Sequence, residues 1–237
     1  GEGFNQQINY WRDQLVGLPP LLELPTDYPR PPLLSYKGAE YPFTIPAEQI
    51  AQLKTLANQR GSTLFMVMLS AWFILLHKYS RQCDFAVGSP VANRNRPELE
   101  GLIGFFVNTI TLRARVDSEM TVGELLDAVK ETTLGAYSNQ DVPFEKIVDI
   151  LSPERSLSYS PIFQVMFTLQ NTPRTNLEVN ETRTTSIAKE GTTAKFDLEL
   201  GVVETGQGAH AVLEYSTDLF SESTMERMAE QYLKILT

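Results

Sequence analysis

The sequence contains a single cysteine, Cys83, and only two histidines, His77 and His210. One cysteine excludes an internal disulfide and a cysteine-based metal set, and it fits a reducing compartment, so we expect a cytoplasmic protein. Neither histidine lies near an Asp, Ser or Cys in a nucleophile pattern, and the motifs HHxxxDG, GxSxG and HExxH are all missing. The sequence therefore predicts no metal site and no local nucleophile–base pair.

Basic runs and long apolar runs are also missing. The net charge is −9 and no Lys/Arg cluster forms a basic stripe, which argues against a nucleic-acid partner. Residues 61–76 carry no charge, but their apolar part is shorter than the ~20 residues that span a bilayer, so we expect no membrane partner. The 237 residues, 42% of them hydrophobic, suffice for a sizeable core in one or two domains.

Hydrophobic periodicity predicts alternating helices and strands. Apolar spacing and capping residues predict helices over 4–15, 46–60, 63–79, 121–137, 143–151 and 221–236. Ser62 is the expected cap of the helix at 63–79, and Thr121 with Glu124 forms a capping box for the helix at 121–137. Two-residue alternation or apolar β-rich runs predict strands over 36–45, 84–91, 105–115, 162–169, 194–203 and 209–215. Residues 171–190 are polar, either a hairpin or an excursion. This order favours the α/β class, with one mixed sheet covered by helices.

Proline marks one segment as different from the rest. Six of the fourteen prolines fall within residues 18–32, which excludes a helix or a central strand there. We expect an extended crossing segment over 18–37. Leu21, Leu22 and Leu24 would pin it to a surface, since a solvated linker needs no such residues.

Residues 101–115, GLIGFFVNTITLRAR, form the most informative stretch. Phe105 to Val107 are continuously apolar, as in a buried strand. From Asn108 onward the pattern alternates, so that Thr109, Thr111, Arg113 and Arg115 share a face opposite apolar residues. The Asn108 amide stands at the change of pattern, where it either holds a bend or lines a cavity, or is simply a satisfied strand-end residue.

Three stretches together resemble condensation domains of nonribosomal peptide synthetases. IGFFVNTITLR is similar to the family pattern (I/V)GxFVNTxxxR. NQDVPFE follows some thirty residues later and is similar to (H/N)QDxPFE. PERSLSYSPIFQVMF comes next and is similar to RDxSxNPLFQVMF, with Ser156, Tyr159 and Ser160 as departures. Their order and spacing are far more specific than any one of them, and GSPVANR, KFDLEL and YSTDLF extend the resemblance over nearly the whole chain.

The resemblance implies a two-lobed fold similar to chloramphenicol acetyltransferase, in which a His of the HHxxxDG motif of the N-terminal lobe is assigned to catalysis. Residues 1–237 look like the C-terminal lobe alone, with no catalytic residue in this chain. The implied reaction forms an amide bond between carrier-bound acyl or peptidyl and aminoacyl thioesters, whose phosphopantetheine arms are substrates, with no bound cofactor. The implied partners are the N-terminal lobe, carrier domains and an adjacent adenylation domain. We also expect self-association of a lone lobe through an exposed apolar face.

Two alternatives share the same resemblance. One is a condensation-like platform that docks carrier or tailoring proteins without chemistry. The other is the corresponding lobe of an epimerisation domain, against which VNT and NQDVPFE argue.

The resemblance also assigns roles by position, with the lobe supplying a tunnel wall and the acceptor-side carrier surface. The residues expected to line the tunnel or the lobe interface are Ser89, Arg94, Asn108, Thr109, Arg113, Gln140 and Asp141. Those expected to support the motifs structurally are Gly104, Pro143, Phe144, Glu145, Arg155, Ser158 and Pro161. A strand-end turn is the alternative for Ser89, a helix C-cap and turn for 139–141, and a solvated or intralobe position for Arg113. Arg155 is expected to brace its loop, because a guanidinium can bridge several carbonyls.

Overall fold

A computed structural model describes residues 1–92, 107–171 and 192–237. Its helices are α1 (Glu2–Gln14), α2 (Ala47–Gln59), α3 (Leu64–Ser80), α4 (Val122–Ser138), α5 (Phe144–Leu151) and α7 (Glu222–Ile235). Its strands are β1 (Lys37–Pro46), β2 (Asp84–Ala92), β3 (Val107–Arg115), β4 (Val165–Asn171), β5 (Thr192–Thr193), β6 (Leu198–Thr205) and β7 (Gly208–Ser216). The predicted α/β class is confirmed. Most of the predicted run 105–107 and of the segment 171–190 lies outside the described residues.

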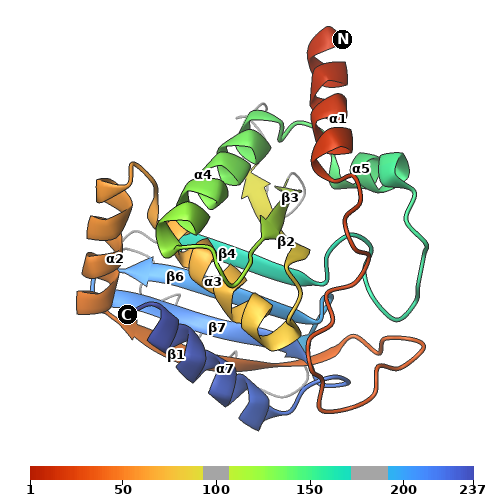
Figure 1. Ribbon diagram of the computed structural model, residues 1–237. Helices are drawn as coiled ribbons and strands as arrows, with labels where there is room; N and C mark the ends of the chain where they lie inside the picture. The colour runs from red at the N-terminus through yellow and green to blue at the C-terminus, as the bar shows by residue number, and fades with distance from the viewer. Residues whose placement is uncertain (93–106, 172–191) are drawn as a thin grey trace.

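The strands form one mixed sheet in the order β3-β2-β4-β6-β7-β1-β5 (Figure 1). Strands β2, β4 and β6 are parallel neighbours, and the remaining pairs are antiparallel. The parallel pair β2 and β4 meets at Gly88 and Met166. A Cβ on Gly88 would lie 2.2 Å from the Phe163 ring, so glycine is needed there for close packing.

Helix α3 lies at the centre of the core, as its apolar sequence predicted. It packs with α2, α4 and α7 on one face of the sheet (Figure 1). Phe73 meets Phe85 of β2 edge to face, and Phe65 meets Phe167 of β4. Its N-cap is Thr63, which accepts from the Met66 N–H, whereas we predicted Ser62. The Ser62 hydroxyl instead donates to the Ala57 carbonyl at the end of α2.

No described helix alone has the length and hydropathy needed to cross a membrane. Helices α2 and α3 reach that length and composition only as a pair, which is bent by 105°.

The proline-rich segment connects α1 to β1 (Figure 1). It contains no helix or strand over residues 18–36, and Leu22 and Leu24 are buried while Leu21 is half-buried. Asp27 accepts from the Ser221 N–H at the start of α7, and Asp218 accepts from the Ser35 N–H. These hydrogen bonds and the two leucines attach the segment to the body of the fold.

The two-residue pattern of β3 predicted one apolar and one polar face, and that contrast is only partly right. Ile110, Leu112 and Ala114 are buried as expected, but Thr111 and Arg113 on the other face are buried too. Helices α1 and α5 contact each other beside this end of the sheet, and Arg113 reaches carbonyls at the end of α1. Sequence alternation identified the two faces of the strand but not this second layer.

Candidate functional site

Asn108 connects the first motif stretch to the second. Its Nδ2 donates to the carbonyls of Gln140 and Val142, at 2.8 and 2.9 Å, and its Oδ1 accepts from the Phe144 N–H at 3.1 Å. The Asn108 side-chain NH2 and carbonyl oxygen therefore all form hydrogen bonds with the backbone of one turn. The amide holds the turn that begins α5, which is the bend-holding interpretation from the sequence.

Helix α1 holds the other side of this turn. The Trp11 indole donates to the Asn139 carbonyl at 2.7 Å. Gln7 and Asp141 form a reciprocal pair, in which the Gln7 amide donates to Asp141 Oδ2 and the Asp141 N–H donates to Gln7 Oε1, both at 3.1 Å. Asn139 is the C-cap of α4, so the alternative of a C-cap and turn is correct for this position.

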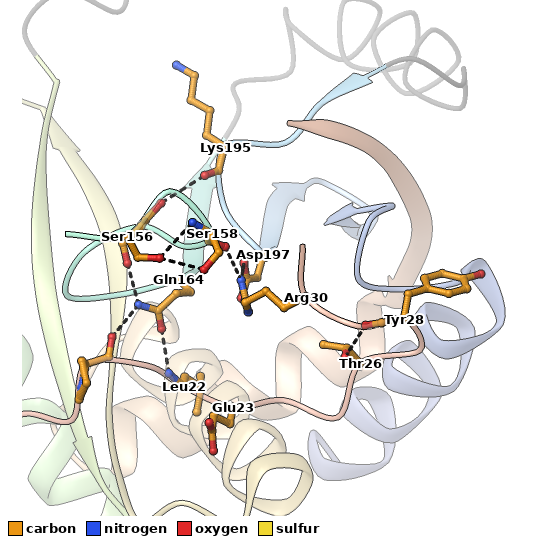
Figure 2. A network of polar contacts seen from close by, with 12 residues as sticks. Leu22, Glu23, Thr26, Tyr28, Arg30, Ser156, Ser158, Gln164, Lys195 and Asp197 are labelled. Carbon is orange, nitrogen blue, oxygen red and sulfur yellow. Dashed lines mark hydrogen bonds and ion pairs between the residues drawn. The ribbon is translucent and has the colours of Figure 1, made fainter. Parts of the chain in front are cut away.

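The third motif stretch is fastened to the crossing segment through Gln164 (Figure 2). The Gln164 side chain accepts from the Leu22 N–H at 2.8 Å and donates to the carbonyls of Pro20 and Ser160, at 3.1 and 2.8 Å. Gln164 is 1% exposed, so these partners satisfy an amide that has no access to bulk water.

Arg30 and Asp197 form an ion pair beside Gln164 (Figure 2). Arg30 Nη1 donates to Asp197 Oδ1 at 3.2 Å and to the Ser158 carbonyl at 2.8 Å, while its Nη2 pairs with Oδ2. The Arg30 guanidinium also lies 5.8 Å from the Tyr159 ring centroid. Burial raises the pKa of Asp197, and hydrogen bonding and attraction to Arg30 oppose that rise.

These two residues show what sequence reasoning missed. Arg30 was not a candidate, and Asp197 was noticed only within the family-like KFDLEL stretch. The available signal was a lone arginine among prolines in a segment expected to be pinned to the surface. Arg155, the predicted brace, is exposed and has no hydrogen bond or ion pair with another residue in the described ranges. Arg30 occupies the bracing position, because it binds the Ser158 carbonyl.

Arg113 is an intralobe residue. Its Nε and Nη2 donate to the two carboxylate oxygens of Asp84, at 2.8 and 2.7 Å, and its Nη1 donates to the carbonyls of Gln14 and Val16, at 2.9 and 2.7 Å. It is 6% exposed. Its donors are committed to Asp84 of β2 and to carbonyls at the end of α1, which is the intralobe position given as the alternative for Arg113.

The remaining candidates divide by position. Ser89 is buried within β2, which continues through Ala92, so the alternative of a strand-end turn at Ser89 is wrong. Thr109 and Gln140 are half-buried, and Asp141 is exposed. Arg94 and Gly104 lie outside the described residues.

The supporting residues join the motif stretches. Pro143 is the N-cap of α5 and not its first helical residue, and Glu145 lies in the first turn. The Phe144 and Phe163 rings pack with centroids 5.0 Å apart, which connects the second motif to the third. The Pro161 carbonyl accepts from the Phe163 N–H at 2.8 Å.

A row of carboxylates crosses three adjacent strands. Glu199 of β6 is paired in register with Glu214 of β7, which is paired with Glu40 of β1. Burial, together with the charges of Glu214 and Glu40, raises the pKa of Glu199 from 4.5 to about 7. Glu199 and Glu214 line a cavity of about 140 Å³ with Lys195 and Phe196.

A larger cavity of about 390 Å³ lies between α1, α4 and β3. Apolar side chains such as Phe73 and Leu125 line it together with Tyr10, Gln14 and Glu131. Burial and the charge of Glu131 raise the pKa of Tyr10.

Neither histidine lines these two cavities. His77 Nδ1 is bonded to the Gln82 carbonyl at 2.8 Å at the end of α3, and His210 lies in β7 opposite Val203 and Thr44. Within residues 1–92, 107–171 and 192–237, no cluster of His, Cys, Asp or Glu could hold a metal ion. The polar side chains of the motif stretches use their hydrogen bonds to hold backbone turns in place, as Asn108 and Gln164 do.

A family model for the condensation domain matches residues 1–237. The chain belongs to the condensation-domain family. It is 52% identical over 238 residues to a linear gramicidin synthase of Brevibacillus parabrevis, covering 100% of this chain and 3% of that protein. It is 41% identical to gramicidin S synthase 2 from Aneurinibacillus migulanus, covering 98% of this chain and 5% of that protein.

The chain is also similar in structure to solved proteins of nonribosomal peptide biosynthesis. The chain superposes on the four-domain nonribosomal peptide synthetase AB3403 with a TM-score of 0.87 and 27% identity, covering 98% of this chain and 19% of the other. It superposes equally well, at 0.87 and 25% identity, on the X-domain in its complex with OxyB from teicoplanin biosynthesis, covering 99% of this chain and 52% of the other. The condensation-domain chain thus spans about half of that structure and a few per cent of the synthetases that it resembles.

Proposed function

We propose that this chain is the C-terminal lobe of a condensation domain that forms amide bonds in a nonribosomal peptide synthetase. The observation that carries the proposal is the junction of the three motif stretches. Asn108 binds the turn at 140–144, and Phe144 of that turn packs on Phe163 of the third stretch. A continuous wall built from three separate stretches suits the side of a substrate tunnel.

In the proposed reaction, the amine of a downstream aminoacyl thioester attacks the carbonyl carbon of an upstream acyl or peptidyl thioester. A C–N bond forms, the C–S bond breaks, and the proton lost by the amine passes to the released thiolate. Both thioesters are carried on phosphopantetheine arms, which are substrates and not a resident cofactor. Orientation of the two arms supplies much of the rate, and a histidine of the N-terminal lobe assists proton transfer.

The proposal assigns this chain a share in binding and orientation. Thr109 and Gln140 lie next to the Asn108 junction, and with Asp141 they are the side chains we assign to the tunnel side. Ser89 is buried within β2, so it supports the tunnel wall by packing inside the lobe and does not face the tunnel. The N-terminal lobe, the carrier domains and an adjacent adenylation domain are the proposed partners, and a cytoplasmic location is part of the proposal.

The test is reconstitution. This chain and the N-terminal lobe of the same synthetase are assayed, separately and together, for amide-bond formation between carrier-loaded substrates. The proposal predicts product only from the combination. Product from this chain alone would contradict it. Self-association of the isolated chain, through exposed apolar side chains such as Leu33, Leu134 and Leu157, is a further expectation of the proposal.

A second function is favoured by one comparison. The X-domain, which the chain resembles with a TM-score of 0.87, is described in complex with OxyB. As the second candidate we propose that this chain is part of a condensation-like platform that docks another protein without chemistry. An intact HHxxxDG motif in the N-terminal lobe favours the enzyme, and a degraded one favours the platform.

A further inference from the structure

We propose that Arg30 is a positioning residue of the condensation domain, which holds loop 152–164 against the ends of the central strands through Asp197. The inference rests on the proposed function and deepens it. Arg30 lies outside the three motif stretches, yet it binds the third stretch at the Ser158 carbonyl.

The described backbone hydrogen bonds hold loop 152–164 at few points, mainly near its two ends, at Ser152 and at Phe163. It connects α5 to β4 without helix or strand. Ile162 adopts φ +71°, and Ser152 adopts φ +44°. A left-handed conformation is costly for a β-branched residue and persists only where surrounding contacts impose it.

The anchor for the loop is Asp197, the residue immediately before β6. Its N–H donates to the Gln164 carbonyl at 2.9 Å, and its carbonyl accepts from the Ser216 N–H at 3.0 Å. Its side chain is 4% exposed, against 20% for Arg30. The aspartate is thus fixed to the first residue before β4 and to the last residue of β7.

Arg30 extends this anchor to the middle of the loop. One guanidinium nitrogen donates both to Asp197 Oδ1 and to the Ser158 carbonyl (Figure 2). The Leu34 N–H donates to the adjacent Leu157 carbonyl at 3.1 Å, so the crossing segment and the loop are joined at two neighbouring residues. A planar fork suits this arrangement, because its two nitrogens stand at fixed positions, whereas a lysine has one nitrogen on a flexible stem and does not hold the same bidentate geometry.

A displacement of loop 152–164 would also displace the residues that Asn108 binds. The loop carries Phe163, whose ring packs on Phe144 at 5.0 Å between centroids, and the Phe144 N–H is bonded to Asn108. Stability alone is a weak reason for a buried ion pair, because desolvation offsets much of its attraction. Placement of the loop is the role that this geometry supports.

The experiment uses the complete synthetase with Arg30→Gln and Arg30→Lys. The control is Arg60→Gln, because Arg60 likewise binds an aspartate, Asp127, and a carbonyl, that of Gly123, but on an exposed surface. Two quantities are measured: hydrogen exchange of the Leu34 amide relative to amides of α3, and kcat and KM for amide-bond formation from carrier-loaded substrates.

Both Arg30 variants should accelerate Leu34 exchange about tenfold or more while α3 is unchanged, and should lower kcat by a similar factor. Arg60→Gln should alter neither quantity. Unchanged Leu34 exchange, equal acceleration in α3, or a wild-type kcat despite a released loop would each overturn the inference. If Arg30→Gln does not fold, the same two measurements on Arg30→Lys test the inference, because lysine keeps the positive charge beside Asp197. If the unaltered synthetase forms no amide bond, the proposed function fails, while exchange still shows whether Arg30 holds the loop.

Discussion

Replacing Asn108 by aspartate tests the junction of the first two motif stretches with almost no change of shape. The asparagine Nδ2 donates to two carbonyls, at 2.8 and 2.9 Å. A carboxylate oxygen in its place has no hydrogen to donate and faces both carbonyl oxygens with like partial charge. Two hydrogen bonds of about 1 kcal/mol each are lost, and part-buried carbonyls are left unsatisfied, so the free energy of unfolding should fall by about 2–5 kcal/mol.

The assay is chemical denaturation at neutral pH, where an aspartate is ionised. Asn108→Ala, which also loses the bond from the Phe144 N–H but brings no repulsion, should cost about 2–3 kcal/mol. Asn9→Asp is the matched control, because exposed Asn9 only accepts from Arg12, at 3.2 Å, and a carboxylate preserves that contact. Asn9→Asp should change stability by less than about 0.5 kcal/mol. A comparably small effect of Asn108→Asp would refute the role assigned to this amide.

Three further changes test other parts of the structure. Because the raised pKa means that folded Glu199 holds its proton more tightly than the unfolded chain does, stability should fall as the pH rises from 4.5 to about 7. Glu199→Gln should remove that fall and stabilise the protein at pH 8 by on the order of 2–3 kcal/mol, as measured by denaturation across this range. Gly88→Ala places a Cβ 2.2 Å from the Phe163 ring, so it should cost about 1–3 kcal/mol and lower the melting temperature. Thr121→Ala removes the hydroxyl of the α4 capping box, so the free energy of unfolding measured by denaturation should fall by about 1 kcal/mol. Glu124→Ala should lower it by less.

Local signals explain why the helices were predictable. The Thr121–Glu124 box is encoded within four neighbouring residues, and the structure contains both of its hydrogen bonds. Helix α3 was recognisable because its apolar residues cover nearly the whole circumference, as in a buried helix. Boundaries were harder to predict where two capping residues are adjacent, as with Ser62 and Thr63.

Long-range partners were not predictable from these signals. The alternation along β3 placed Arg113 on a polar-looking face, but its partners at Gln14 and Val16 lie almost a hundred residues away in sequence. Arg30 and Asp197 are farther apart still. Periodicity shows which face a residue occupies and says nothing of what packs against that face. Asn108 was singled out because the pattern changes there, and the structure identifies the turn it binds.

The proposed function assigns substrate orientation to this chain and proton transfer to the N-terminal lobe. The most direct measurement is the rate of amide-bond formation by the complete domain when both His77 and His210 are replaced by glutamine. The account predicts a rate within about threefold of the unaltered domain, since neither imidazole lies at either described cavity. A loss of about a hundredfold or more in a folded double variant would place the catalytic imidazole in this chain and contradict the account.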